Sequence, residues 1–182
     1  RAVQVVGDEG LAQPILVGRP DVVATRVERL GLRIRPGEDF PLINPQDDPR
    51  FRTYWQTYHE LMQRGGVSPE AAREIVRTRS TVIAALAVRL NDADAMICGV
   101  TGRYKHHLDH VCNVIGRSEE VHDCSAISLV ILPSGSFFIV DTYVSPDPTA
   151  EEIAEMTILA AQHVSRFGLQ PKVALLSHSN FG

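Results

Sequence analysis

The chain has 182 residues, of which 44% are hydrophobic and 22% are charged, a composition typical of one folded domain or of two small ones. Its 18 basic and 22 acidic residues give a net charge of −4, which argues against a general affinity for nucleic acid or for an anionic membrane. No apolar run approaches the roughly 20 residues that cross a bilayer, and no secretory signal is recognisable. The three cysteines lack CxxC spacing and predict no disulfide framework, so we expect a reducing, cytoplasmic environment. From the charge and the lack of a long apolar run, we expect binding to neither nucleic acid nor membrane.

Helices and short apolar strands alternate along the first part of the chain. Asp21, Asp48 and Ser68 each precede a helical pattern and are assigned as helix caps. The run 81–90 is apolar nearly all round, which is typical of a helix packed on two sides. In chain order, the predicted elements are the end of a helix over 1–10, a strand over 15–17, a helix over 21–30, a strand within 40–43, a helix over 48–64, a helix from residue 68, a helix over 81–90 and a strand over 93–99.

A polar helix, a hairpin and a longer helix follow. The polar helix covers 103–115 and contains three of the seven histidines. Two β-rich runs flank a Pro-Ser-Gly-Ser turn and predict a hairpin over 126–142. Thr149 and Glu152 form a capping box at the start of a long helix that ends at Gly168, and the last predicted strand covers the apolar run before Ser177.

The order of these elements indicates the fold class. Strands alternate with helices, and the strand runs are apolar throughout, so the sequence predicts an α/β, three-layer fold with a mostly parallel sheet flanked by helices. Because the chain starts within a helix and stops just after a strand, we expect the fold to be incomplete at both ends. Parallel sheets bind ligands at the carboxyl ends of their strands, which directs attention to the loops 99–103, 141–145 and 177–182.

The sequence KHHLDH at 105–110 is the first candidate site. His106 and His110 lie one helical turn apart, a spacing that can bind zinc, with His122 or Cys124 as a further ligand. The alternative is a solvated polar helix. We favour it because the glutamate of the HExxH motif is absent and the further ligands are arbitrary, and we assign no metal site.

Residues after the predicted strands are the second set of candidates. Asp141 and Thr142 end an apolar strand, although Asp141 is equally suited to anchoring the loop that follows it. Arg103 follows Gly99, where a guanidinium can bind phosphate, or it is simply solvated. The run LLSHSNFG supplies hydroxyl and amide groups suited to phosphate or pantetheine, unless it is only a turn that closes the strand: Ser177, Ser179 and Asn180.

Several common sites are not supported by the sequence. GxSxG is absent, and His178 is badly placed to serve as a base for Ser177 or Ser179, because adjacent residues in an extended segment point to opposite faces. GxGxxG, Walker and zinc-ribbon patterns are also absent. We therefore assign no catalytic residue and no nicotinamide or ATP site to this chain.

Four stretches, taken in order, resemble the phosphate acetyl/butyryl transferase family: RGGVSPEAA at 64–72, DADAMICG at 92–99, FFIVDTYVSPDPTAEEIAEMTILAA at 137–161 and KVALLSHSNFG at 172–182. The resemblance covers the whole chain, which corresponds to only about the first half of such a module. In active transferases a helix after the second stretch carries an arginine used for substrate phosphate, and the ungapped match places Asp109 there. A carboxylate repels the acyl phosphate that an arginine would hold. Phe181 similarly replaces a lysine.

The stretches GRYKHHLDHVCNVIG and LSHSNFG are instead similar to the version of this module that follows the catalytic part of bacterial NADP-dependent malic enzymes. That resemblance implies acetyl-CoA as an effector, a homo-oligomer, a malic-enzyme catalytic domain in the same polypeptide with NADP and Mg or Mn, and no transferase activity. It also implies a first α/β subdomain over 1–120 and the start of a second over 121–182. The alternatives are an active phosphate acetyltransferase and a purely structural interaction module.

Overall fold

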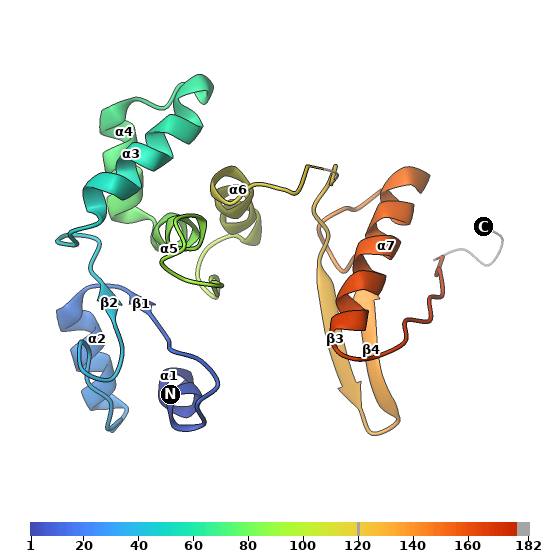
Figure 1. Ribbon diagram of the computed structural model, residues 1–182, viewed down its shortest axis with the longest axis horizontal. Helices are drawn as coiled ribbons and strands as arrows, with labels where there is room; N and C mark the ends of the chain where they lie inside the picture. Colours follow the sequence, from blue (N-terminus) through green and yellow to red (C-terminus); the bar gives the residue numbers. More distant parts are fainter. Residues whose placement is uncertain (120, 178–182) are drawn as a thin grey trace. The chain divides into compact units, whose positions relative to one another are not determined.

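The computed structural model describes residues 1–119 and 121–177, which form two compact units, Arg1–Gly116 (unit 1) and Arg117–Gly182 (unit 2). Each unit is described by itself. That they are the first subdomain and the start of the second subdomain of a larger module stays a prediction. The elements of the described residues are α1 (Ala2–Asp8), β1 (Leu16–Val17), α2 (Pro20–Arg29), β2 (Leu42–Ile43), α3 (Phe51–Met62), the short 3-10 helix η1 (Gln63–Gly65), α4 (Pro69–Thr78), α5 (Ser80–Arg89), α6 (Tyr104–Val114), β3 (Ile127–Leu132), β4 (Gly135–Val140) and α7 (Ala150–Arg166) (Figure 1).

Helix α5 lies at the centre of unit 1. Its sequence is apolar nearly all round because α3, α4 and α6 all pack against it, which confirms the predicted packing on more than one side. Val82, Ala85 and Leu86 are completely buried. The other buried members of this core are Ile43, Tyr54, Tyr58, Ala72, Val76, Ile83, Ala87 and Val114.

Strands β1 and β2 form a short parallel pair in unit 1, with Leu16 opposite Leu42 and Val17 opposite Ile43. Both strands were predicted. Ile43 is buried in the core that surrounds α5, so the pair is held to the helices through its apolar side chains. Because each strand has only two residues, the helices supply most of the buried surface of this unit.

Two predicted helix caps are wrong. Helix α2 begins at Pro20, with Arg19 as its N-cap, because proline is favoured in the first turn and Asp21 then lies within that turn. Helix α3 begins at Phe51, since the Asp48 carboxylate accepts the Arg50 N–H at 2.9 Å and holds the preceding residues in a turn. The cap predicted at Ser68 is confirmed, because its hydroxyl accepts the Ala71 N–H at 3.2 Å.

The strands predicted over 93–99 and 172–176 are not formed within the described residues. An extended segment becomes a strand only when its backbone N–H and C=O groups pair with a neighbour. Neither segment has such a neighbour here, and the Ile97 and Leu176 side chains are almost fully exposed. The parallel sheet of the predicted three-layer fold is therefore represented, in the described part of the chain, by β1 and β2 alone.

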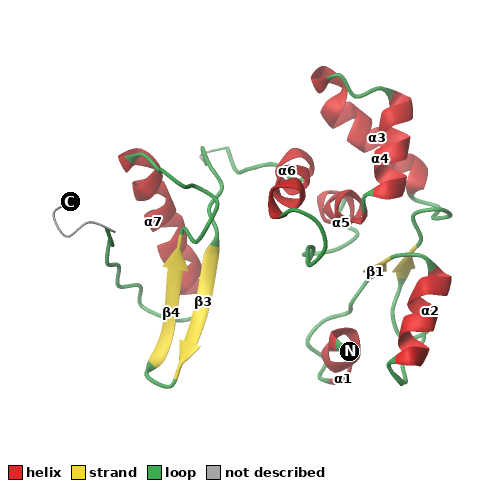
Figure 2. Ribbon diagram, turned by 180° about the vertical axis from the view of Figure 1, so that it is seen from behind, coloured by secondary structure: helices red, strands yellow, loops and turns green. Residues whose placement is uncertain are grey.

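Unit 2 contains the predicted hairpin and the long helix. Strands β3 and β4 pair antiparallel from Ile127–Val140 to Leu132–Gly135 (Figure 2). Helix α7 packs against β4, and the Phe138 and Phe167 ring centroids lie 5.3 Å apart. The opposite face of the hairpin is apolar except for Ser128, and three of its side chains are about half exposed: Leu132, Phe137 and Ile139.

Local signals determine both ends of α7. The Thr149 hydroxyl accepts the Glu152 N–H at 3.2 Å, and the Glu152 carboxylate accepts the Thr149 N–H at 2.6 Å, so the predicted capping box is confirmed. Gly168 adopts φ 73° after the last turn, as expected of a helix stop. In the part of the chain that the structure describes, no helix is both long and apolar enough to span a membrane.

Candidate functional site

The loop before α6 carries the candidate ligand residue Arg103. Arg103 is the N-cap of α6 in an extended conformation, and its carbonyl accepts the N–H groups of His106 and His107. The backbone before it is unusual, because Gly99, Val100 and Gly102 have φ values of 121°, 69° and 98°. Glycine adopts such angles readily, whereas a β-branched residue does not.

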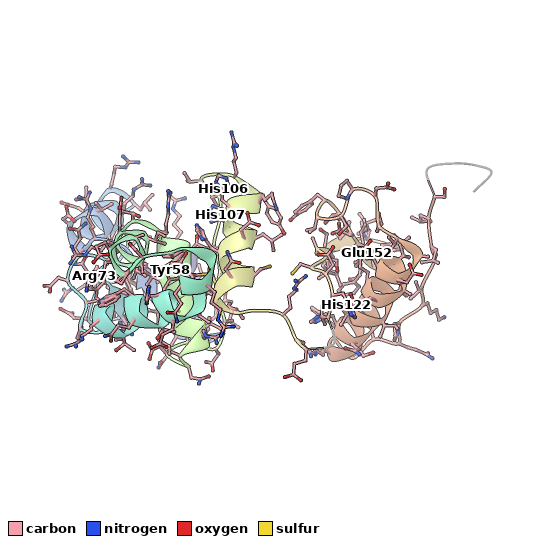
Figure 3. The ribbon with its side chains drawn as sticks, turned by 90° about the horizontal axis from the view of Figure 1, so that it is seen from above. Tyr58, Arg73, His106, His107, His122 and Glu152 are labelled. Carbon is pink, nitrogen blue, oxygen red and sulfur yellow. The ribbon has the colours of Figure 1, made fainter. Side chains whose placement is uncertain are left out.

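His107 lies on α6 (Figure 3) and ties this loop to the core of unit 1. Its Nε2 lies 2.8 Å from the Thr101 carbonyl oxygen, and its Nδ1 lies 2.7 Å from the Thr81 hydroxyl of α5. A carbonyl oxygen only accepts, so Nε2 carries the proton. In the neutral imidazole Nδ1 then accepts from Thr81. The ring therefore links α6, α5 and the loop through two hydrogen bonds.

The remaining polar residues of α6 do not assemble a metal site. Both ring nitrogens of His107 already make hydrogen bonds. His110 is half-buried, and its pKa lies below the ordinary value because of burial and of the nearby Arg79 and His107. Across residues 1–119 and 121–177, no group of three or more His, Cys, Asp and Glu side chains is arranged to hold a metal ion.

Asp109 occupies the position where the resemblance implies a phosphate-binding arginine. Its carboxylate lies 3.2 Å from the Lys105 ammonium, one helical turn earlier, and both side chains are substantially exposed. An exposed ion pair of this kind contributes little to stability, about 0.3–0.5 kcal/mol. The Asp109 carboxylate differs in the sign of its charge from the arginine that the resemblance implies at this position.

Asp141 anchors the loop after β4 in unit 2. Its carboxylate accepts the N–H groups of Ala126 at 2.7 Å, Val144 at 2.7 Å and Ser145 at 2.6 Å. Burial raises the pKa of this carboxyl, but the backbone hydrogen bonds outweigh it and hold the pKa below the ordinary value. The geometry supports the anchoring alternative for Asp141, and contact with a ligand stays a prediction.

The other candidates are only partly brought together. The Thr142 hydroxyl lies 3.2 Å from the Ser128 hydroxyl of β3, so it borders the Asp141 anchor. Ser177 is exposed near the end of the described residues. Ser179 and Asn180 lie outside the described residues. Arg103 belongs to unit 1, so the structure describes it apart from these unit 2 residues.

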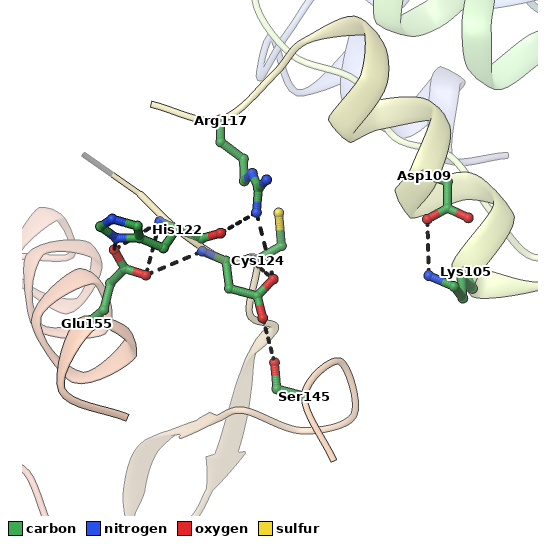
Figure 4. Close-up of polar contacts among 8 residues, drawn as sticks. Lys105, Asp109, Arg117, His122, Cys124, Ser145 and Glu155 are labelled. Carbon is green, nitrogen blue, oxygen red and sulfur yellow. Dashed lines mark hydrogen bonds and ion pairs between the residues drawn. The ribbon is translucent and has the colours of Figure 1, made fainter. Parts of the chain in front are cut away.

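A polar network in unit 2 was not predicted. The Glu155 carboxylate of α7 accepts the backbone N–H of His122 at 3.1 Å and lies 3.2 Å from its Nδ1, and these bonds lower the pKa of Glu155 (Figure 4). Arg117 donates to the His122 carbonyl and lies 3.9 Å from Asp123, whose carboxylate also accepts from the Ser145 hydroxyl at 3.4 Å. This network joins the entry to β3 with α7 and with the Asp141 loop. The links from His122 to Glu155 and from Asp123 to Ser145 join residues 33 and 22 positions apart in the sequence, so no local pattern indicates them.

Several curated proteins are similar to this chain over nearly its whole length. A malic enzyme described as NAD-dependent, from Rhizobium meliloti (strain 1021), is 56% identical over the whole chain, which spans 24% of that relative. An NADP-dependent malic enzyme of Escherichia coli (strain K12) is 51% identical over 95% of the chain and 23% of the relative. A phosphate acetyltransferase of Nitratidesulfovibrio vulgaris is 31% identical over 98% of the chain and 25% of the relative. The chain thus spans about a quarter of the length of these relatives.

Structural similarity leads to the same fold. The EutD phosphotransacetylase from Staphylococcus aureus superposes with a TM-score of 0.76 over 98% of this chain and 61% of that chain, at 20% sequence identity. This likeness confirms the α/β phosphotransacetylase-like fold. The family model described as phosphate acetyl/butaryl transferase matches residues 1–182. The chain therefore belongs to the phosphate acetyl/butaryl transferase family.

Proposed function

We propose that this chain is the C-terminal, phosphotransacetylase-like module of a cytoplasmic malic enzyme, and that it binds acetyl-CoA as a regulatory ligand without transferring the acetyl group. The parent reaction is the oxidative decarboxylation of malate to pyruvate. The printed names of the relatives support a malic-enzyme parent, because identity to them is 51–56%, against 31% for the transferase.

One observation carries the non-catalytic assignment, which is the pairing of Asp109 with Lys105 at the position expected for a phosphate-binding arginine. The pair places a carboxylate, and not a guanidinium, at this point of the helix. A site that must hold acetyl phosphate during transfer needs positive charge here, whereas a site that only holds CoA can bind its phosphates elsewhere.

We do not assign the cofactors of the parent reaction to this chain. A nicotinamide coenzyme needs a glycine-rich turn between a strand and a helix, and the sequence has no GxGxxG motif. A divalent metal needs clustered oxygen ligands, and no such cluster exists among the described residues. We therefore place NADP and Mg or Mn in the catalytic domain of the same polypeptide.

Regulation requires that acetyl-CoA bind one arrangement of the enzyme more tightly than another. We propose that the module forms part of a homo-oligomer and that acetyl-CoA favours the less active packing. A ligand that bound both arrangements equally would change nothing, so the proposal demands a measurable difference in affinity between them.

The test is an assay of malate oxidation by the full-length polypeptide, with NADP and with NAD, in the presence and absence of acetyl-CoA. We expect acetyl-CoA to lower the rate and to bind in a calorimetric titration. A rate that is insensitive to saturating acetyl-CoA would contradict regulation. Absence of binding would favour the structural alternative, in which the module only assembles the oligomer.

The enzymatic alternative is an active phosphate acetyltransferase. It is tested on the same preparation by following CoA release from acetyl-CoA and inorganic phosphate. We expect no release above the uncatalysed background, because Asp109 repels the phosphate anion. Sustained turnover would overturn the non-catalytic assignment while leaving the family assignment intact.

A further inference from the structure

The loop that presents Arg103 is held in a conformation that its own sequence does not favour. Val100 has φ 69°, a region that β-branched residues rarely occupy, and its side chain is fully exposed. No burial of the Val100 side chain offsets this cost. Contacts elsewhere in the loop must therefore maintain its shape.

His107 supplies such contacts. Thr81, which is 5% exposed, is fixed within α5, and its hydroxyl lies 2.7 Å from Nδ1 of the ring. On the other side of the ring, Nε2 donates to the Thr101 carbonyl, only two residues before Arg103. The imidazole therefore connects a rigid, buried helix to the centre of the loop.

Gly102 allows this close approach. It adopts φ 98°, and a Cβ atom at this position would lie 3.3 Å from His107 Nε2, tighter than an ordinary contact. A side chain would therefore have to displace the ring or the loop. The hydrogen bond from His107 to the loop therefore depends on glycine at position 102.

We propose that His107 is a positioning residue for acyl-CoA binding, because its hydrogen bond to the Thr101 carbonyl fixes the loop that presents the Arg103 guanidinium to a phosphate group of the ligand. This inference rests on the proposed function for its ligand. The fixing of the loop is a separate claim with its own measurement.

The test compares H107Q with H107N in the full-length polypeptide. The glutamine amide can occupy the position of Nε2 and donate to Thr101, whereas the shorter asparagine amide can occupy only the position of Nδ1. Two quantities are measured: the acetyl-CoA dissociation constant by calorimetry, and the rate of limited tryptic cleavage after Arg103. Cleavage after Arg89, which ends α5, is the internal control for general unfolding of unit 1.

We expect H107N to accelerate cleavage after Arg103 and to weaken acetyl-CoA binding by about three- to tenfold each, the effect of losing one hydrogen bond. Cleavage after Arg89 should not change. H107Q should remain within about twofold of the natural protein in both measurements. G102A, which disturbs the same contact from the loop side, should behave like H107N.

Two outcomes would overturn the proposal. One is unchanged cleavage after Arg103 in H107N and G102A, and the other is an H107Q variant that is as impaired as H107N. If the natural protein does not bind acetyl-CoA at all, the proposed function fails. The cleavage rates would then still decide whether His107 fixes the loop.

Discussion

At the scale of single residues, Asp141 anchors the loop that follows β4. Replacing it with asparagine removes a charged acceptor and turns an amide group toward backbone N–H donors, so we expect D141N to lower the free energy of unfolding by about 2 kcal/mol. Urea denaturation measures this change. The matched control is D147N, which alters an exposed aspartate of the same loop and should have almost no effect.

The lowered pKa of Asp141 also leads to a prediction of how the free energy of unfolding depends on pH. Its pKa is lowered in the folded state, so between that value and the unfolded pKa of about 3.9 the unfolded chain binds more protons. The stabilisation is therefore complete above about pH 4 and is lost as the pH falls through the folded pKa. Unfolding curves from pH 2 to pH 6 should show a shallower acid loss for D141N. Parallel curves for the two proteins would contradict the assignment.

A substitution at Val100 is expected to raise the free energy of unfolding. Glycine tolerates φ 69°, and the exposed valine side chain has no packing to lose, so V100G should stabilise unit 1 by about 1 kcal/mol. Ile97 is the control, because it is equally exposed without a positive φ, and I97G should destabilise by about 0.5–1 kcal/mol. If both substitutions destabilise equally in urea, Val100 carries no backbone strain.

At the scale of elements, the capping box of α7 is the clearest local determinant. T149A removes the acceptor for the Glu152 N–H and should cost about 1 kcal/mol. Thr157 offers the same substitution in the middle of the same helix, where its hydroxyl bonds only to the Ile153 carbonyl. Because alanine favours helix interiors, T157A should be neutral or slightly stabilising. Thermal unfolding followed by circular dichroism compares the two, and equal losses would exclude a special role for the cap.

Elements with local causes were predictable from the sequence, whereas elements that depend on distant partners were not. The capping box, the hairpin turn and the all-round apolar α5 each follow from residues that are neighbours in the chain. The segment 93–99 has the composition of a strand, yet composition cannot supply the neighbouring strand that pairing requires. The histidine-rich helix was predicted, but the role of His107 depends on Thr81, which lies 26 positions away in the sequence.

At the scale of the whole molecule, apolar burial is unequal between the two units. Every completely buried apolar side chain of the described residues lies in unit 1, from Phe40 to Val114. In unit 2 the hairpin contacts α7 but keeps Phe137 and Ile139 about half exposed. Because apolar burial is the main favourable term in folding, the described residues of unit 2 gain less stabilisation per residue from their contacts.

This imbalance predicts different local stabilities within the 182-residue polypeptide. Backbone amides open with free energies that range from almost zero to the global value, and the best-buried elements open last. In hydrogen exchange followed by mass spectrometry, peptides from α5 should therefore exchange more than about tenfold more slowly than peptides from β4. The matched variant L86A removes a fully buried side chain and should cost about 2–5 kcal/mol. That loss should accelerate exchange in α5 while leaving β4 unchanged, because the two elements belong to different compact units. Equal acceleration in both elements would mean that the chain unfolds as one cooperative body.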